Sequence, residues 1–425
     1  MPRSRFLAGL VWLTIGLGSA AWVVAALHLR SPYLLPLRER VFWIWITLGA
    51  MAALYLFLQR KRLRSGFHPL HLAACAAVLG SAMAGMGQWN HFRNRQKCMT
   101  ASVGDMPEIG GHLVVGWLGF EETRGLAAKG GIAGVFLTQR DFPPGSHSTD
   151  IRRTVDALQT ARREAGLPRL WIATDQEGGP VSKLSPPLPM QAALGTLLKD
   201  LDGPALASQP GRAAEIVRRV TAYADAQGQA LAEAGINLNF APVVDLRPAA
   251  PPGSLDRNSR IYHRALAADP ATVALAGETY VTVLAWHGVT AVLKHFPGLG
   301  RVPADTHHFS ARLDVPIADL QTTDWVPFRE ISKHTRAGVM LGHVQLTSLD
   351  PEHPASGSPA TVRFLRETWG VTGLLVTDDF SMAPISHGPG GISRAAANSM
   401  AAGVDLILLS YDAQAVYDLL GPGME

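Results

Sequence analysis

The sequence predicts an α/β fold, a (β/α)8 TIM-type barrel preceded by two or three transmembrane α-helices. Three observations support this prediction. Long uncharged apolar segments lie within residues 1–98, eight short β-type runs alternate with helical patterns in residues 99–425, and charged or ionisable side chains follow five of those runs. We therefore expect an N-terminal membrane anchor, residues 1–98, and a barrel domain, residues 99–425.

Three segments of the anchor contain no acidic or basic side chains other than histidine: residues 6–28, 41–58 and 69–89. About 20 helical residues cross a hydrocarbon core of roughly 30 Å, so the first two segments are strong candidates for membrane spans. Polar residues such as His71 and Gln88 dilute the third, for which a packed or membrane-surface helix is the alternative. A cleavable signal peptide is the alternative for the first, although its apolar run is long and a second span follows closely.

The formal net charge of +4 is unevenly distributed. Residues 1–98 contain twelve basic side chains and one acidic side chain, whereas residues 99–425 contain 26 basic and 33 acidic ones. The positive charge therefore belongs to the membrane anchor, and we expect the lipid bilayer, not nucleic acid, as its partner. With three spans, six basic residues would lie on each side, so counting charges leaves the orientation open; the cluster at residues 60–64 favours an N-terminus inside the cell.

The barrel prediction rests on the alternation of strand-like and helix-like segments. The β-type runs are His112–Leu118, Gly134–Gln139, Arg169–Asp175, Asn237–Asp245, Thr290–Phe296, Gly338–His343, Leu374–Asp379 and Asp405–Tyr411. The helical patterns include Thr149–Ala165, Gly211–Ala234, Pro270–His287, Ile317–Thr335, Pro359–Trp369 and Gly391–Ala402, and a short helix, Ala413–Leu420, is expected after the eighth run. Eight parallel βα units fit a closed barrel better than an open sheet.

Ionisable side chains gather where the predicted strands end. In a parallel barrel, the loops after the carboxyl ends of the strands carry the functional residues. One Asp of a pair often caps the next helix, and a lone histidine is more often a hydrogen-bonded core residue. Packing needs only apolar side chains there, so five such strand ends together indicate an active site. The residues are Asp175, Asp245, Lys294, His295, His343, Asp378 and Asp379.

The loop after the fifth run adds a carboxylate and an imidazole, in Asp305-Thr306-His307-His308. A carboxylate two residues from a histidine can orient the imidazole and stabilise its protonated form. Such a pair on a loop is structural as often as it is functional. Together with the strand-end residues, it is a candidate general acid/base.

Five motifs resemble family 3 glycoside hydrolases, and in particular their single-domain β-N-acetylglucosaminidase branch, which removes GlcNAc from cell-wall muropeptides. They are ATDQEGG, GINLNFAPVVDL, KHFPGLG followed by ADTHH, VMLGHVQLTSLD and LLVTDDFSM. The resemblance extends in order from about Gly110 to Leu409. The DTH loop distinguishes this branch from the β-glucosidases of the family, which carry their acid/base on a further C-terminal domain.

The resemblance implies the catalytic residues. Asp378, the first Asp of TDDFSM, matches the nucleophile that forms a covalent glycosyl-enzyme. His307 matches the acid/base histidine of this branch, and Asp305 matches the aspartate paired with it. An imidazole can give and take a proton near neutral pH, so it can replace the second carboxyl group of an ordinary retaining glycosidase.

The resemblance also implies the sugar-binding residues, which are Asp175, the Lys294-His295 pair and Arg260. Arg260 is matched to the arginine of an RSF-like motif, although Ile261-Tyr262 makes that match looser. Charge-assisted hydrogen bonds from these side chains would hold the terminal sugar. A carbohydrate substrate is implied, and neither a metal ion nor an organic cofactor.

The sequence departs from the family pattern at three places. Pro180 and Lys183 stand where arginines are common, and Leu299 replaces a histidine in FPGLG. The chain also stops soon after the eighth run. None of these departures removes an implied catalytic group, but they bear on substrate fit and on the stability of the barrel.

Three other functions remain open. A phosphorylase of the same branch would use phosphate in place of water in the second step. A non-catalytic, membrane-anchored glycan-binding protein would keep the barrel without turnover. A metal-dependent barrel hydrolase is a third alternative, because four histidines lie near the predicted strands, but the first strand lacks a His-x-His pair and two cysteines exclude a four-cysteine zinc site. The histidines are His112, His295, His307 and His343.

The implied substrate bears on location. Cell-wall glycans lie outside the cytoplasmic membrane of bacteria, which favours three spans and an exported barrel. We therefore expect a multi-pass protein of the bacterial inner membrane with its barrel on the periplasmic or extracellular side.

Overall fold

The computed structural model describes residues 2–27, 35, 37–59, 69–203, 209–250, 258–302 and 305–423. The chain forms two compact units, Met1–Lys97 and Cys98–Glu425. Each unit has its own packed hydrophobic interior.

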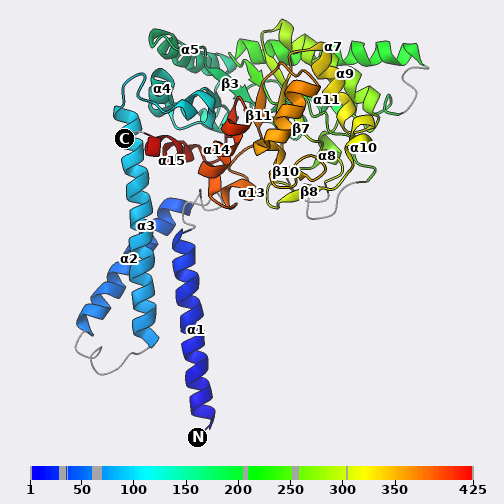
Figure 1. Cartoon of the computed structure of the whole chain (residues 1–425). Coiled ribbons are helices and arrows are strands. Elements are labelled where there is room, and N and C mark those ends of the chain that lie inside the picture. Colours follow the sequence, from blue (N-terminus) through cyan, green and yellow to red (C-terminus); the bar gives the residue numbers. More distant parts are fainter. Residues whose placement is uncertain are drawn as a thin grey trace. The chain divides into compact units, whose positions relative to one another are not determined.

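The N-terminal unit consists of three helices, α1 (Pro2–Leu27), α2 (Arg38–Leu58) and α3 (Pro69–Thr100) (Figure 1). Trp22 of α1 stacks on Trp45 of α2 with ring centroids 4.1 Å apart. The Ser81 hydroxyl of α3 donates a hydrogen bond to the Trp45 carbonyl oxygen at 2.6 Å. One tryptophan of α2 therefore contacts both other helices.

Two helical stretches of this unit, Arg38–Leu58 and Leu70–Thr100, are long and apolar enough to cross a membrane. The described apolar stretch of α1, Leu13–Ala26, is shorter. The helix α3 extends beyond the predicted residues 69–89, because residues 90–100 contain neither proline nor glycine to end it.

The barrel unit contains one eight-stranded sheet in which all the pairings are parallel. An isolated parallel bridge between Val376 and Leu406 joins the two ends of the sheet, so the sheet closes on itself. Each of the eight predicted runs contains one strand, which confirms the barrel. In spatial order the strands are β11 (Leu375–Thr377), β9 (Gly338–Leu341), β7 (Thr290–Phe296), β6 (Leu238–Asn239), β3 (Trp171–Thr174), β2 (Gly134–Phe136), β1 (Leu113–Gly116) and β12 (Ile407–Leu409).

Side chains alternate between the two faces of the sheet. Along β1, Val114 belongs to the cluster inside the barrel, whereas Leu113 and Val115 belong to the cluster between strands and helices. Inside, the rings of Phe136 and Phe240 stack with centroids 5.9 Å apart. The barrel is thus filled by side chains, and only its ends can hold a ligand.

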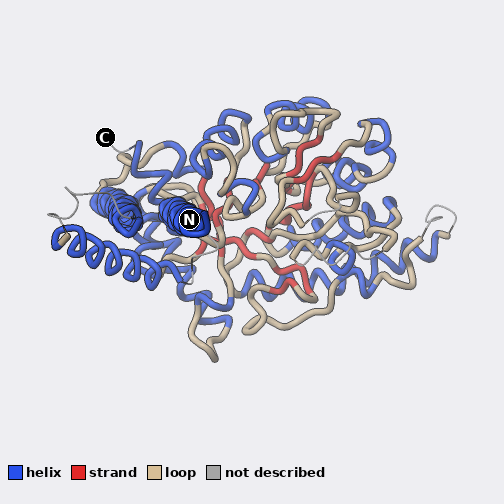
Figure 2. Tube along the Cα trace, turned by 90° about the horizontal axis from the view of Figure 1, so that it is seen from below, coloured by secondary structure: helices blue, strands red, loops and turns tan. Residues whose placement is uncertain are grey.

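The helices surround the strands (Figure 2). Two predicted helices are divided in the structure. Residues 317–335 form α10 and α11, because Thr323 leaves the helical conformation (φ −131°, ψ −100°), and residues 359–369 form α12 followed by a π turn. The main helices are α4 (Phe120–Lys129), α5 (Ser148–Glu164), α7 (Pro210–Glu233), α9 (Pro270–Trp286), α10 (Ile317–Thr322), α11 (Trp325–His334), α12 (Pro359–Arg363), η7 (Phe364–Thr368) and α14 (Gly391–Ala402).

The short helix α15 (Val416–Leu420) follows β12 and packs against the start of the barrel. Its Tyr417 and Leu420 side chains are fully buried, and the Tyr417 hydroxyl donates a hydrogen bond to Glu122 Oε2 at 2.6 Å. This contact ties the last helix to α4.

The loops at the carboxyl ends of the strands contain small elements that the sequence did not reveal. The pairs are β4 with β5 and β8 with β10, and the short helices are α6, α8 and α13. Their bounds are β4 (Gln176–Gly178), β5 (Val181–Ser182), β8 (Ala311–Leu313), β10 (Val344–Leu346), α6 (Leu194–Leu197), α8 (Ile261–Arg264) and α13 (Ala383–Ser386).

Candidate active site

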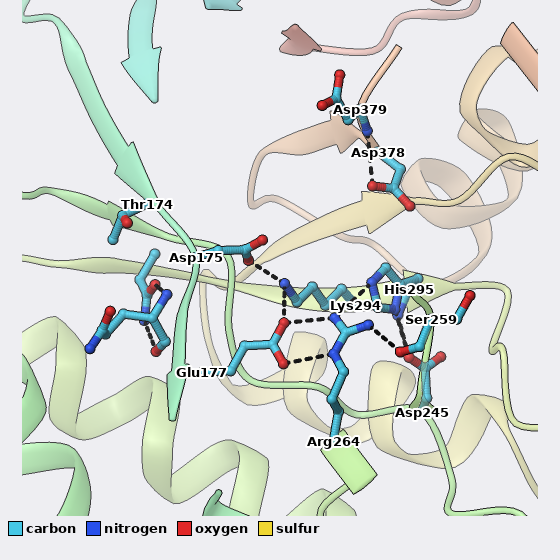
Figure 3. A network of polar contacts seen from close by, with 12 residues as sticks. Thr174, Asp175, Glu177, Asp245, Ser259, Arg264, Lys294, His295, Asp378 and Asp379 are labelled. Atoms are coloured by element: carbon cyan, nitrogen blue, oxygen red, sulfur yellow. Dashed lines mark hydrogen bonds and ion pairs between the residues drawn. The ribbon is translucent and has the colours of Figure 1, made fainter. Parts of the chain in front are cut away.

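The ionisable strand-end residues lie at one end of the barrel. Asp175 directly follows β3, Lys294 and His295 lie near the end of β7, His343 follows β9 and Asp378 follows β11. Figure 3 shows Asp175, Lys294, His295 and Asp378 close together. They meet because parallel strands place their carboxyl ends at the same rim.

Lys294 is the centre of a buried ionic network. Its ammonium group contacts both Asp175 Oδ1 and Glu177 Oε1, the latter at 2.6 Å. Arg264 holds the same Glu177 carboxylate with two hydrogen bonds, of 2.7 and 2.9 Å. Of the two carboxylates, Asp175 is the more accessible, with 23% of its side chain exposed against 5% for Glu177. Asp175 can therefore reach a ligand, while Glu177 supports the two cations.

The network stays charged despite its burial. Burial alone would raise the pKa of Glu177, but Arg264 and Lys294 lower it to about 2. Burial would lower the pKa of Lys294, yet Asp175 and Glu177 outweigh this effect and raise it above its ordinary value. The pKa of Arg264 is also raised, because Glu177 opposes the effect of burial. Each buried charge is thus paired with an opposite one.

The arginine of this network is Arg264, whereas Arg260 was predicted to be the sugar-binding arginine. Arg260 is exposed and precedes α8 with φ 47°, while one turn later Arg264 has only 7% of its side chain exposed. Arg264 Nη2 also lies 3.4 Å from His295 Nε2. The segment Arg264-Ala265-Leu266 has a small and then a large apolar residue after arginine, which fits an RSF-like pattern better than Arg260-Ile261-Tyr262.

His295 is oriented by a fully buried aspartate, Asp245. Its Nδ1 lies 2.7 Å from Asp245 Oδ2, and its backbone N–H donates to the same oxygen at 3.1 Å. The other oxygen of Asp245 accepts a hydrogen bond from the Leu299 N–H at 2.7 Å. Because Asp245 accepts the Nδ1 proton, Nε2 of His295 is the atom that faces Arg264.

The two consecutive aspartates after β11 have different environments. Asp379 is held on both oxygens, by the N–H groups of Ser381 and Tyr411 (2.8 and 3.1 Å) and by the hydroxyl of Ser410 (2.5 Å). Asp378 Oδ1 accepts a hydrogen bond from the Asp379 N–H at 2.9 Å. Asp379 therefore shapes the turn, and Asp378 is the carboxylate with capacity for a further partner.

The charges of three histidines act on the Asp378 carboxylate. Burial would raise the pKa of Asp378, but His295, His343 and His307 outweigh it, and the pKa lies below its ordinary value. Asp378 is therefore ionised at neutral pH. Burial raises the pKa of Asp379 instead.

His343 is a structural neighbour of this carboxylate. Its Nδ1 lies 2.8 Å from the Ser356 hydroxyl, and its Nε2 lies 3.0 Å from the Asp379 carbonyl oxygen. Burial lowers its pKa, so the ring is neutral at pH 7 and Nε2–H donates to the carbonyl. Both nitrogens are occupied, which agrees with the expectation of a hydrogen-bonded core histidine.

Asp305 and His307 form a hydrogen-bonded pair on the loop after β7. His307 Nδ1 lies 2.9 Å from Asp305 Oδ1. The imidazole has 40% of its surface exposed, while the carboxylate is fully buried. Asn258 donates to Asp305 Oδ2 from its backbone and its side chain, both at 2.9 Å, and Ser259 donates to Oδ1 at 3.1 Å.

These donors keep Asp305 charged. Burial would raise the pKa of Asp305, but the hydrogen bonds from His307 and Asn258 outweigh it and lower the pKa far below the ordinary range. A permanent carboxylate thus orients the His307 ring and leaves Nε2 to the accessible side.

The four histidines of the metal-hydrolase alternative do not meet. His112 precedes β1, at the amino end of the strands, where its Nδ1 contacts the Asp405 carbonyl oxygen at 2.9 Å. The other three lie at the carboxyl end. Among the residues that the structure describes, no group of three or more His, Cys, Asp or Glu side chains is arranged to hold a metal ion.

Comparison with known proteins identifies the family to which this barrel belongs. The family model described as "Glycosyl hydrolase family 3 N terminal domain" matches residues 108–423. The chain belongs to glycosyl hydrolase family 3. It is therefore a glycoside hydrolase by family, and the curated proteins that it resembles include a beta-hexosaminidase of Stenotrophomonas maltophilia (strain K279a), 32% identical over 306 residues, which are 70% of this chain and 83% of that protein.

Solved structures of family 3 share the barrel. A beta-N-acetylglucosaminidase from Paenibacillus sp. str. FPU-7 aligns with a TM-score of 0.63 and 28% identity, over 74% of this chain and a little over half (57%) of that one. A beta-N-acetylhexosaminidase from Beutenbergia cavernae DSM 12333 aligns with a TM-score of 0.62 and 28% identity, over 74% of this chain and 89% of the other.

The residues at which this family 3 member departs from the expected pattern fit the structure without changing the ionic network. Pro180 and Lys183 are exposed, and Lys183 contributes its backbone, whose N–H donates to the Asp175 carbonyl at 3.0 Å. Leu299 is buried in the core while its N–H holds Asp245. None of the three side chains takes part in the ionic network.

Sequence reasoning missed Glu177 and Arg264. Glu177 stands in the ATDQEGG motif two residues after Asp175, so alternation along an extended segment could have shown that both face one side. Arg264 lies shortly before Asp269-Pro270, where α9 begins. Its short distance from this helix start was the signal that could have identified it.

Proposed function

We propose that the protein is a retaining β-N-acetylhexosaminidase that hydrolyses terminal β-linked GlcNAc. The observation that carries the proposal is the Asp378 carboxylate after β11, which accepts one hydrogen bond, from the Asp379 N–H, among the residues that the structure describes, together with the hydrogen-bonded Asp305–His307 pair. The names of the relatives, beta-hexosaminidase and beta-N-acetylglucosaminidase, support the sugar.

In the proposed first step, an Asp378 oxygen attacks the anomeric carbon while His307 Nε2 protonates the glycosidic oxygen. The bond to the aglycone breaks, and a glycosyl ester of Asp378 forms. In the second step, His307 takes a proton from water, the water oxygen attacks the anomeric carbon, and the ester bond breaks. Asp305 stabilises the imidazolium in the first step and accepts its Nδ1–H throughout.

The sugar would be held by the ionic network. Asp175 is its more accessible carboxylate and can accept hydrogen bonds from hydroxyl groups, while Lys294 and Arg264 supply N–H donors and His295 Nε2 is an acceptor. We assign to Arg264 the role that was predicted for Arg260, because Arg264 is the guanidinium that reaches Glu177 and His295.

The proposal is tested on the full chain in detergent with 4-nitrophenyl N-acetyl-β-D-glucosaminide. We expect release of nitrophenol and, by proton NMR during the first minutes, the β-anomer of GlcNAc. The α-anomer would contradict a retaining mechanism. Accumulation of sugar 1-phosphate in phosphate buffer would indicate a phosphorylase, and binding without turnover would indicate a glycan-binding protein.

We further propose that residues 1–98 anchor the barrel to the bacterial inner membrane and that its substrates are peptidoglycan fragments on the periplasmic or extracellular side of that membrane. The two long apolar helices support the anchor, and the basic side chains of this part match the polar surface of a membrane. Three spans with the N-terminus inside predict that alkaline phosphatase fused after residue 100 is active and that green fluorescent protein fused there is dark. The opposite pattern would place the barrel in the cytoplasm.

A further inference from the structure

Asn239 of β6 and Asn237, the residue before this strand, use their side chains to add hydrogen bonds to the sheet. In the segment Asn237-Leu238-Asn239, Leu238 points into the barrel interior. Both asparagines are buried, and both form hydrogen bonds with the backbone of the segment that contains β3. An asparagine side chain carries the same C=O and N–H groups as a peptide, so it can pair with a backbone where the strand itself has ended.

Asn239 makes this pairing at the turn that carries the acidic residues. Its Oδ1 accepts a hydrogen bond from the Gln176 N–H at 2.9 Å, and its Nδ2 donates to the Gln176 carbonyl at 3.0 Å. Gln176 stands between Asp175 and Glu177. One side chain therefore fixes both backbone polar groups of the residue that separates the two carboxylates bound to Lys294.

Asn239 is itself held in one orientation. Its Nδ2 also donates to the Tyr280 hydroxyl at 3.0 Å, and that hydroxyl donates to Gln227 Oε1. Burial raises the pKa of Tyr280 well above its ordinary value, so the hydroxyl keeps its proton. The amide of Asn239 cannot flip without losing these partners, and each such buried group left unpaired is costly.

From this geometry we propose that Asn239 is a positioning residue for sugar binding: it fixes Gln176 so that Asp175 and Glu177 converge on Lys294. The inference rests on the proposed function, since it assumes that Asp175 binds the sugar. Asn239 touches none of the residues assigned to the chemical step, so it acts through the placement of the acidic turn.

The chain offers a matched control directly before the same strand. Asn237 makes the equivalent pair of hydrogen bonds, accepting from the Ile172 N–H at 2.7 Å and donating to the Leu170 carbonyl at 3.0 Å. These partners lie at the amino end of β3, away from the site. Asn237→Ala and Asn239→Ala thus remove the same bonds from opposite ends of one strand pair.

We expect Asn239→Ala to lower kcat/KM for 4-nitrophenyl N-acetyl-β-D-glucosaminide by about 10- to 100-fold, because displacement of binding groups by about 1 Å has effects of this size. The inhibition constant of GlcNAc should rise in parallel, because the loss is one of sugar binding. Asn237→Ala should lower Tm to a similar extent but leave both constants within about threefold of the wild type. Tyr280→Phe, which keeps the Gln176 pair, should give an intermediate loss.

Equal kinetic losses in both asparagine variants, or unchanged kinetics in Asn239→Ala, would overturn the proposal. If Asn239→Ala does not fold, unchanged GlcNAc inhibition in Tyr280→Phe would also overturn it. Crystal structures of the variants are independent of activity: Asp175 and Glu177 should separate from Lys294 only in Asn239→Ala. An inactive wild type would refute the proposed function, while this structural comparison would still decide the role of Asn239.

Discussion

Replacing Asp378 with alanine is expected to lower kcat by a factor on the order of 10⁴ or more, because the enzyme then lacks the atom that forms the glycosyl ester. The folded structure should persist, since the substitution removes the hydrogen bond that the Asp378 carboxylate accepts from the Asp379 N–H and keeps the backbone bond to Leu341. The measurement is turnover of 4-nitrophenyl N-acetyl-β-D-glucosaminide. Added azide should restore product release and give the α-glycosyl azide, because the small anion attacks directly from the vacated side.

The neighbouring Asp379 provides the contrast. Its carboxylate accepts hydrogen bonds from Ser381, Ser410 and Tyr411, so Asp379→Asn should mainly reduce stability, by about 1–3 kcal/mol. Kinetics and denaturant unfolding of both variants separate the two roles. Asp378 would be excluded as the nucleophile if Asp378→Ala kept a tenth of the wild-type kcat. Formation of the β-glycosyl azide by this variant would exclude it as well.

Replacing His307 with alanine is expected to lower kcat/KM by about 10²- to 10⁴-fold. The loss should be larger for an alkyl or sugar aglycone than for 4-nitrophenol, because a good leaving group needs little protonation. Equal losses for both leaving groups would contradict the acid role of His307. His308→Ala is the control: His308 is exposed, contacts Asn258, and its loss should change kcat/KM by less than about threefold.

Asp305→Asn is expected to lower kcat/KM, because the neutral amide cannot stabilise the imidazolium that protonates the glycosidic oxygen. The Asp305 carboxylate is fully buried, and its Oδ1 lies 2.9 Å from His307 Nδ1. The loss should be larger for an alkyl or sugar aglycone than for 4-nitrophenol, as for His307→Ala. An unchanged kcat/KM would contradict the pairing.

The positions of most elements could be predicted because local patterns decide them. Each predicted β-type run contains a strand, and α14 begins and ends at the predicted residues, Gly391 and Ala402. The predicted helix over residues 317–335 was wrong in one respect. It is divided at Thr323, next to Asp324, whose carboxylate is held by Arg301 from a distant loop, and a helical pattern cannot reveal such a contact.

The sequence alone determined the family resemblance, the eight βα units and the rim at which the ionisable residues gather, since strand ends follow from local hydrophobic patterning. The tertiary structure decided which charges meet there. It paired Glu177 with Arg264, 87 residues away, and Lys294 with Asp175, 119 residues away. It also showed that Asn239 holds the turn between the two carboxylates. These contacts join different strands and loops, so they exist only once the barrel closes and burial makes every unpaired charge costly.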